Sequence, residues 1–226
     1  MPLRTIHQPI PISDSHRRRS NYWSVYSIKA NRPIELFSDL EYSHWLLMEC
    51  NPEVISLCEK PLELSIGQGA NKIRRVFDLW LQWRSGLTEY VSVVRSDKLV
   101  PTNHNQLLPA RWKEISDWAR AHGTVVRFVA DDTLYQSKTR LTNYRLLYPY
   151  VMQSQARRSK DLLASIVGLV TRRQNIRLQE VLDAMPPPVT DTLEHCFQAI
   201  YEGAVEVELD KSVLSRQSLL RAVDHE

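Results

Sequence analysis

Two acidic residues have the type and setting that a divalent-metal site requires. Asp78 lies in an otherwise apolar strand candidate, and Glu41 lies on a helix candidate that precedes it. Mg²⁺ prefers hard oxygen ligands, with water and phosphate completing its shell, so converging carboxylates are typical of metal-dependent nucleases. The residues alone also allow plainer interpretations. Asp78 is then an exposed strand residue paired with Arg74 or Arg75, and Glu41 is an ordinary surface glutamate.

The elements that would position these groups alternate between helix and strand. A helix is predicted over Glu35–Glu49, with Ser38 or Asp39 as its cap. Further on, Trp83–Gly86 is a hairpin signal between two strands, and Pro149 closes a later helix. The other predicted elements are strands at Val54–Cys58, Leu62–Ile66, Arg75–Gln82, Glu89–Arg95 and Val125–Val129, and helices at Ala110–His122 and Leu141–Tyr148. This order predicts an α/β domain with a mixed sheet flanked by helices.

The last third of the chain has a different outline. Three helices are predicted at Ser159–Arg173, Leu178–Met185 and Val189–Glu202, and an alternating strand follows at Ala204–Leu209. Three helices and a β-ribbon within about 75 residues are the outline of a small winged-helix domain. The predicted organisation is therefore an extended basic arm at 1–33, a first domain at 34–150 and a winged-helix domain at 151–226.

The net charge of +3 is unevenly distributed. Residues 1–150 hold 20 Lys/Arg and 15 Asp/Glu, a balance of +5, whereas residues 151–226 hold 9 and 11, a balance of −2. An anionic partner such as DNA is therefore expected on the first part, although a solvated mixed-charge surface is the alternative. The arm adds an Arg17–Arg19 run. The predicted DNA-binding residues are Lys72, Arg74, Arg75, Arg111, Lys113, Lys138 and Arg140.

The third helix of the winged-helix segment points to a different partner. It carries Asp191, Glu194 and Glu202 but no Lys or Arg, and more acids follow it. A helix that reads DNA bases presents Arg, Lys, Asn or Gln, and acids facing phosphates would repel them. We therefore expect this domain to bind protein rather than DNA.

Other classes of function lack their signatures. The seven histidines and three cysteines show no zinc spacing, and neither a glycine-rich phosphate loop nor a nucleophile elbow is present. His44 is three residues after Glu41, so it is expected to border the site or to be structural. No apolar stretch approaches a membrane span, and an odd number of cysteines fits reduced thiols in a cytosolic protein.

Several ordered motifs resemble the TnsA family, the endonuclease subunit of heteromeric cut-and-paste transposons. The resemblance covers residues ~35–220 and rests on a Ser-x-Leu-Glu helix, an x-Pro-x-Val turn, a Glu-Gln-Pro-like strand and a Pro-Asp-Phe strand. In this chain these motifs read Phe37-Ser-Asp-Leu-Glu-Tyr, Asn51-Pro-Glu-Val, Glu59-Lys-Pro and Val76-Phe-Asp-Leu-Trp-Leu. A restriction-endonuclease-like fold for residues 34–150 is what the resemblance implies.

The same resemblance implies a catalytic site and partners. Glu41 and Asp78 match the metal ligands for Mg²⁺ or Mn²⁺, but the Glu/Gln-x-Lys strand departs from the family. One register places Ser92 and Val94 at its two positions, and the other places Val93 and Arg95 there. Ser92 is a poor Mg²⁺ ligand and Arg95 does not readily act as a base. Ser92 and Arg95 are the candidate replacements.

The resemblance implies one reaction and a set of partners. The family cleaves the 5′ ends of the transposon beside a DDE transposase (TnsB-like). It also docks on an AAA+ ATPase regulator (TnsC-like), here through the C-terminal domain. We expect double-stranded DNA at transposon ends as the nucleic-acid partner, and a prokaryotic, cytoplasmic, nucleoid-associated location. Because the third element is degenerate, an inactive architectural subunit bridging transposase and regulator is the alternative. A nuclease-fold protein of defence or repair is a more distant one.

Overall fold

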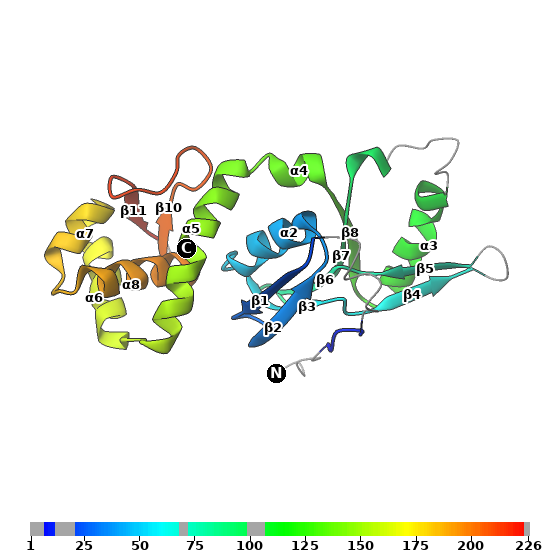
Figure 1. The fold of residues 1–226 in the computed structure, drawn as a ribbon, viewed down its shortest axis with the longest axis horizontal. Helices are drawn as coiled ribbons and strands as arrows, with labels where there is room; N and C mark the ends of the chain where they lie inside the picture. The colour runs from blue at the N-terminus through cyan, green and yellow to red at the C-terminus, as the bar shows by residue number, and fades with distance from the viewer. Residues whose placement is uncertain (1–6, 12–20, 68–71, 99–106, 224–226) are drawn as a thin grey trace. The chain divides into compact units, whose positions relative to one another are not determined.

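The computed structural model describes residues 7–11, 21–67, 72–98 and 107–223 of the 226-residue chain. It divides into two compact units (Figure 1). Unit 1 comprises residues 1–49 and 53–136, and unit 2 comprises residues 50–52 and 137–226. The division therefore comes earlier than the predicted boundary at 150/151, which falls inside helix α5 (Lys138–Ala156).

Unit 1 is built on a four-stranded mixed sheet, so the predicted α/β class with a mixed sheet is confirmed. The strands are β3 (Val54–Glu59), β6 (Leu79–Trp83), β7 (Thr88–Val94) and β8 (Val125–Ala130), in that spatial order. All neighbours are antiparallel except β7 and β8, which are parallel. Gly86, with φ +88°, makes the predicted hairpin turn between β6 and β7.

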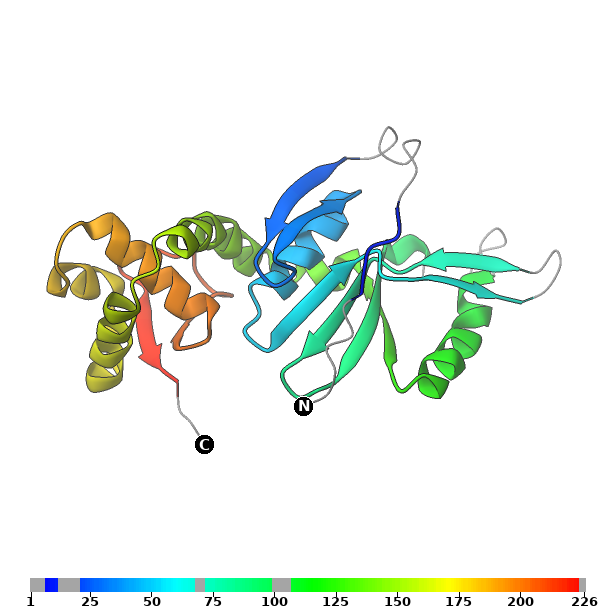
Figure 2. The same ribbon diagram turned by 90° about the horizontal axis from the view of Figure 1, so that it is seen from below.

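Helices flank this sheet, as Figures 1 and 2 show. Helix α2 (Asp39–Glu49) packs on β3 and β7, and helix α3 (Leu107–Ala121) packs on β8. A short 3₁₀ helix, η2 (Ser96–Lys98), follows β7, and helix α4 (Asp131–Tyr135) follows β8. One apolar core under α3 joins the aromatic and aliphatic side chains of Phe77, Trp80, Tyr90 and Ile115.

Two further hairpins extend unit 1 beyond the sheet. Part of the predicted arm is a hairpin of β1 (Trp23–Ser27) and β2 (Arg32–Leu36), whose Ile34 and Leu36 are fully buried. Residues 23–33 of the predicted arm therefore belong to a hairpin whose buried aliphatic residues lie just beyond the arm, and the Arg17–Arg19 run lies outside the described residues. The second hairpin, β4 (Glu63–Ile66) with β5 (Ile73–Val76), extends away from the sheet (Figure 2).

Two predicted element boundaries in unit 1 were wrong. The helix expected from Glu35 begins at Asp39, because β2 occupies the preceding residues and Ser38 caps the helix. The single strand expected over Arg75–Gln82 is two strands, β5 and β6, separated by Phe77 and Asp78. The interruption matters because Asp78 belongs to the candidate site.

Unit 2 surrounds one central helix. After α5, the chain forms α6 (Lys160–Arg173), β9 (Asn175–Arg177), α7 (Leu178–Ala184), α8 (Val189–Tyr201), β10 (Val205–Val207) and β11 (Leu219–Ala222). The three short strands form an antiparallel sheet in the order β10-β11-β9. Helix α8 packs against α5, α6 and α7 and has more buried residues than the other described helices of unit 2.

Pro149 does not end its helix, contrary to the prediction, and lies inside α5. Pro149 itself is exposed, whereas Leu147, Tyr148 and Val151 around it are buried. Packing of these neighbours outweighs the hydrogen bond that the proline removes. Within the described part of the chain, none of the helices is both long and apolar enough to span a membrane.

Candidate functional site

The two predicted carboxylates converge on one lysine in unit 1. Lys60 Nζ lies 3.0 Å from Glu41 Oε2 and 2.7 Å from Asp78 Oδ1. The side chains are largely shielded from water, with 9% of Lys60 and 14% of each acid exposed. Three charged groups from three separate segments thus form one buried ion-pair cluster, which we call the Glu41–Lys60–Asp78 cluster.

The start of helix α2 holds Glu41 in place. Ser38 Oγ accepts a hydrogen bond from the Glu41 amide at 3.0 Å, as a helix N-cap does. Glu41 Oε2 reaches back and accepts a 3.0 Å hydrogen bond from the amide of Phe37. This reciprocal arrangement resembles a capping box and fixes the direction of the carboxylate.

The gap between β5 and β6 holds Asp78. Its amide donates to the Val91 carbonyl at 2.8 Å, and its carbonyl accepts from the Lys60 amide at 3.0 Å. Its second carboxylate oxygen, Oδ2, accepts a 2.7 Å hydrogen bond from the Val93 amide. Asp78 therefore joins β7 to the end of β3 through both its backbone and its side chain, which rules out the interpretation of an exposed strand residue.

Electrostatics keep the central lysine charged. Burial acts to lower the pKa of Lys60, but the Asp78 and Glu41 carboxylates more than offset it, so the pKa of Lys60 is raised. Burial raises the pKa of Glu41, and the nearby Asp78 charge adds to this effect, while Lys60 opposes it. The ammonium is therefore what makes two neighbouring buried carboxylates tolerable.

The third predicted element is only partly in the cluster. Ser92 is fully buried on β7 next to Val93, and its Oγ accepts a 2.9 Å hydrogen bond from Arg75 Nε. Val94 is also buried. Arg95 is 69% exposed, and its guanidinium pairs with Asp97 at 3.4 Å rather than with either carboxylate. Ser92 thus lies beside the cluster, whereas Arg95 does not join it.

The cluster as arranged does not fit a Mg²⁺ or Mn²⁺ ion. The described residues include no group of three His, Cys, Asp or Glu side chains that could hold a metal. The two carboxylates that converge already share the Lys60 ammonium, and the Ser92 hydroxyl accepts from Arg75. A hard divalent cation binds through oxygen atoms, so an ion that entered here would have to displace the Lys60 ammonium from both carboxylates.

The predicted DNA-binding residues fall into several settings. Lys72 and Arg74 are exposed on the β4–β5 hairpin, and Lys113 is exposed on α3. Arg75 is half-buried over the Phe128 ring, 5.1 Å from its centroid, so it is not a free phosphate contact. Arg111 lies on α3, but its side chain is outside what the structure describes. Two others, Lys138 and Arg140, belong to unit 2, where Arg140 pairs with Asp210.

Lys60 is the residue that the sequence interpretation missed. It lies between two quoted motif residues, in Glu59-Lys60-Pro61, where the resembled family has a glutamine. A lysine at the end of a buried strand and directly before a proline is an unusual placement, because burial of an unpaired ammonium is costly. That placement could have indicated a special role for Lys60, but the sequence does not show which acids, 18 and 19 residues away, pair with it.

His44 lies close to the cluster and is buried on α2, with only 4% of the residue exposed. Its Nδ1 has no hydrogen-bond partner among the described residues. Burial lowers the pKa of His44 from 6.5 to about 4, with the Arg127 charge adding to the effect and the Asp78 charge opposing it. His44 is therefore neutral in the folded protein at pH 7.

Acid is expected to destabilise unit 1 through His44. The folded-state pKa is depressed, so its stabilising contribution is complete above pH 6.5 and is lost as the unfolded chain takes up a proton at lower pH. Between pH 6.5 and pH 5 we expect a loss of about 2 kcal/mol. The free energy of unfolding is measured at each pH by urea unfolding followed by tryptophan fluorescence. His44→Leu should remove this dependence of stability on pH, while His122→Leu, at an exposed position, should keep it.

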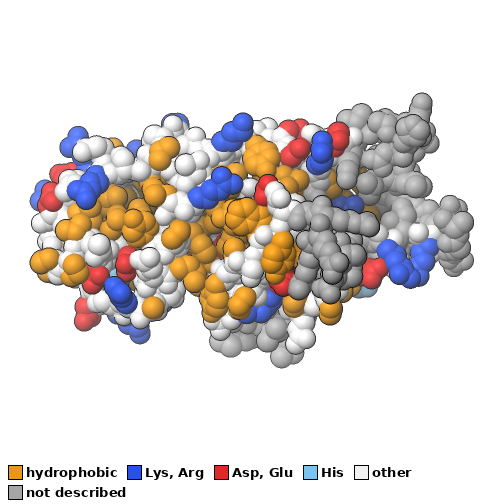
Figure 3. Space-filling view, viewed as in Figure 1, with side chains coloured by type: hydrophobic (Ala, Val, Ile, Leu, Met, Phe, Trp, Pro, Cys, Tyr) orange, Lys and Arg blue, Asp and Glu red, His pale blue; other side chains and the backbone are white. Residues whose placement is uncertain are grey.

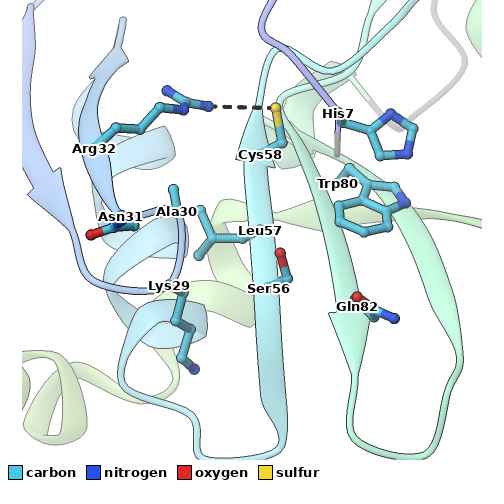
Figure 4. A pocket seen from close by; sticks show the side chains of 10 residues that line it. All are labelled: His7, Lys29, Ala30, Asn31, Arg32, Ser56, Leu57, Cys58, Trp80 and Gln82. Atoms are coloured by element: carbon cyan, nitrogen blue, oxygen red, sulfur yellow. Dashed lines mark hydrogen bonds between the residues drawn. The ribbon is translucent and has the colours of Figure 1, made fainter. Parts of the chain in front are cut away.

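The pocket beside β3 has a cysteine, Cys58, in its wall. A cavity of about 190 Å³ is lined by residues that include His7, Arg32, Cys58 and Trp80 (Figure 4). The Arg32 guanidinium donates to Cys58 Sγ at 3.6 Å. Burial nevertheless raises the pKa of Cys58 to about 11, so the group remains a thiol at neutral pH.

The Glu41–Lys60–Asp78 cluster is therefore the strongest indication of function. No protein-family model matches the sequence, and no curated protein is significantly similar to it. Chemically, the cluster joins a helix start, a strand end and the β5–β6 junction through one shared cation. Such an arrangement bridges this junction, and its single positive charge offsets one of the two negative charges of the acids.

Proposed function

We propose that the chain is a TnsA-like subunit of a cut-and-paste DNA transposition machine, in which it acts mainly as an architectural component. Unit 1 is a restriction-endonuclease-like domain that holds double-stranded DNA at the transposon ends. Unit 2 is a winged-helix domain that binds the partner proteins, a DDE transposase and an AAA+ regulator. The cluster in unit 1 is the nuclease-type site of the resembled family, altered by its own lysine.

Two features support the nuclease-like assignment of unit 1. The mixed sheet flanked by helices is compatible with it. Glu41 and Asp78, which the resemblance assigns as metal ligands, come within 3.0 Å of one shared atom although 36 residues lie between them in the chain. Convergence of this kind is expected of paired site residues and not of unrelated surface acids.

The observation that carries the architectural role is the position of Lys60. Its ammonium contacts both acids, and Arg75 engages Ser92, the buried polar side chain of the degenerate third element. Both acids are therefore already paired with a cation that the chain itself supplies. A nuclease of this type would need its carboxylates to bind Mg²⁺ and activate water.

The convergence of Glu41 and Asp78 favours a second candidate, an active nuclease. In that case Lys60 supplies, from the end of β3, the cation that the family places on the strand equivalent to β7. A lysine this close to both carboxylates is in reach of a scissile phosphate bound there. Removing such a charge usually costs orders of magnitude in rate.

A reconstituted reaction separates the two candidates. The purified protein, its transposase, the ATPase and a donor plasmid are incubated in Mg²⁺ or Mn²⁺, with wild type and Asp78→Asn side by side. The architectural role predicts joining at one strand only and no change in Asp78→Asn. Products cut at both strands, and reduced more than about 100-fold in Asp78→Asn, would establish the nuclease instead.

A protein-binding role for unit 2 is supported by features other than the charges of its third helix. The order of three helices and a three-stranded antiparallel sheet fits the winged-helix outline. However, the third helix, α8, is mostly buried, and Glu194 within it is only 4% exposed. Its charges therefore do not define a surface, and Glu202 pairs with Arg158. In the segment that follows α8, the acids Glu206, Glu208 and Asp210 are exposed.

Exposed apolar side chains add to this support. Figure 3 shows apolar side chains gathered over the part of unit 2 that contains α6 to α8. Val213 is 56% exposed and Val189 is 47% exposed. A shallow groove of about 140 Å³ is lined by Leu146, Tyr150 and Phe197, among others. Surfaces of this kind are more typical of protein contacts than of phosphate contacts.

DNA binding by unit 1 is expected to depend on the β4–β5 hairpin. Lys72 and Arg74 are exposed, so Lys72→Ala/Arg74→Ala should remove up to two phosphate contacts. Each lost contact lowers the slope of log affinity against log salt by about 0.9. Fluorescence anisotropy with a duplex at several salt concentrations measures this slope. The equally charged control Arg172→Ala/Arg173→Ala, on exposed positions of α6, should leave it unchanged.

A further inference from the structure

The meeting point of the two acids in unit 1 already holds a cation. Lys60 Nζ contacts Glu41 Oε2 at 3.0 Å and Asp78 Oδ1 at 2.7 Å, and it lies 5.7 Å from the centroid of the Phe37 ring. The ammonium therefore has two anionic partners and one aromatic face around it. These are favourable surroundings for a partly desolvated cation.

Two of the carboxylate oxygens in the cluster also accept backbone hydrogen bonds. Glu41 Oε2 accepts from the Phe37 amide as well as from Lys60, and Asp78 Oδ2 accepts from the Val93 amide. At the third element, the Ser92 hydroxyl accepts from Arg75. A divalent ion that entered would have to displace an ammonium from two carboxylates and compete with these donors.

The backbone of Lys60 has an unusual conformation that neighbouring residues hold in place. Its φ is +43°, a left-handed conformation that non-glycine residues seldom adopt. The strained conformation is maintained by two backbone hydrogen bonds, from the Lys60 amide to the Asp78 carbonyl at 3.0 Å and from the Ile10 amide to the Lys60 carbonyl at 2.9 Å. Such outliers persist where the surroundings over-determine them and concentrate at functional sites.

A pocket of about 410 Å³ borders the cluster on the side of Lys60. Its wall includes Lys60 and Phe37, together with Ile10 and Glu59, whereas Glu41 and Asp78 are not among its lining residues. The lysine, and not the two carboxylates, is therefore the member of the cluster that this pocket exposes.

We propose that Lys60 is a built-in replacement for the divalent cation of this site. Its ammonium links Glu41 and Asp78 permanently, so unit 1 binds neither Mg²⁺ nor Mn²⁺ between them, and removal of the ammonium opens a divalent-cation site. This inference concerns the chemistry of unit 1 alone and holds whether or not the chain acts in transposition.

Mn²⁺ binding to the full chain tests the proposal directly. Electron paramagnetic resonance counts the free Mn²⁺ in titrations of wild type, Lys60→Met and the control Lys72→Met, which removes an exposed lysine of the same unit. We expect Lys60→Met to bind one Mn²⁺ at least about tenfold more tightly than wild type and Lys72→Met. Adding Asp78→Asn to Lys60→Met should abolish the gain.

Two results would overturn the proposal. One is a wild-type protein that binds a single Mn²⁺ as tightly as Lys60→Met and loses it in Asp78→Asn. The other is a folded Lys60→Met that gains no Mn²⁺ affinity. If Lys60→Met does not fold, the wild-type titration alone still decides, because strong binding there that Asp78→Asn abolishes contradicts a resident ammonium. The plasmid reaction reports separately on transposition, so the two ideas fail independently.

Discussion

Asp78→Ala is expected to destabilise unit 1 by about 3 kcal/mol, whether or not the protein cuts DNA. The change removes the acceptor of the Val93 amide and one of the two carboxylates that pair with the buried Lys60 ammonium. The Glu41 carboxylate remains, so the lysine is not left without a partner. Loss of activity in Asp78→Ala is therefore ambiguous, and Asp78→Asn is the better catalytic test.

Tryptophan fluorescence makes this measurement specific. All six tryptophans belong to unit 1, so urea unfolding followed by their emission reports on that unit alone. The control Asp97→Ala removes an acid that is 62% exposed and should change stability by less than about 0.5 kcal/mol. The double variant Asp78→Ala/Lys60→Met should lose less than the sum of the single changes, because the two groups interact. Strictly additive losses would contradict the ion pair.

Asn143→Ala is expected to cost unit 2 a similar amount, about 3 kcal/mol. Asn143 is fully buried on α5, and its side chain makes three hydrogen bonds to the segment between β10 and β11. Nδ2 donates to the carbonyls of Leu209 at 2.8 Å and Ser212 at 2.9 Å, and Oδ1 accepts from the Leu214 amide at 2.8 Å. One side chain thus satisfies three backbone hydrogen-bonding groups of this irregular segment.

Hydrogen exchange followed by mass spectrometry locates the effect of Asn143→Ala. Peptides covering residues 208–218 should exchange faster in the variant, and the far-UV circular dichroism melt should shift to lower temperature. Thr142→Ala changes the exposed neighbour on the same helix and is the matched control. Unchanged exchange in the 208–218 peptides would show that other contacts hold the segment.

Regular elements of the fold could be predicted from the sequence because their signals are local. Strand β8 is apolar except for Arg127, Gly86 marks the β6–β7 turn, and α6 has an apolar face bounded by the cap Ser159. The wrong boundaries, at Asp78 and Pro149, have tertiary causes. Asp78 interrupts a strand to bond β7, and packing around Pro149 continues a helix that local preference would end.

Of the three residues in the cluster, only the two acids could be predicted from the sequence. Glu41 and Asp78 were identified by residue type and by family resemblance, and the structure brings them together. Lys60 was missed because pairing between residues 18 and 19 positions apart depends on how β3 meets α2 and β5. The prediction of an acidic surface on α8 was wrong for a related reason. Composition does not show that Glu194 is buried or that Glu202 pairs with Arg158.

The path of the chain between its units limits how the protein can be dissected. Residues 50–52 belong to unit 2 although unit 1 precedes and follows them in the chain. Within unit 2, Pro52 packs so closely that a Cβ added at Gly203 would lie 2.7 Å from the Pro52 Cβ. A protease cut or a truncation after residue 136 would therefore separate unit 2 from part of its own packing. Each unit is built from two separate segments of the chain. A chimaera that replaces unit 2 with a domain of another protein would have to replace residues 50–52 together with residues 137–226.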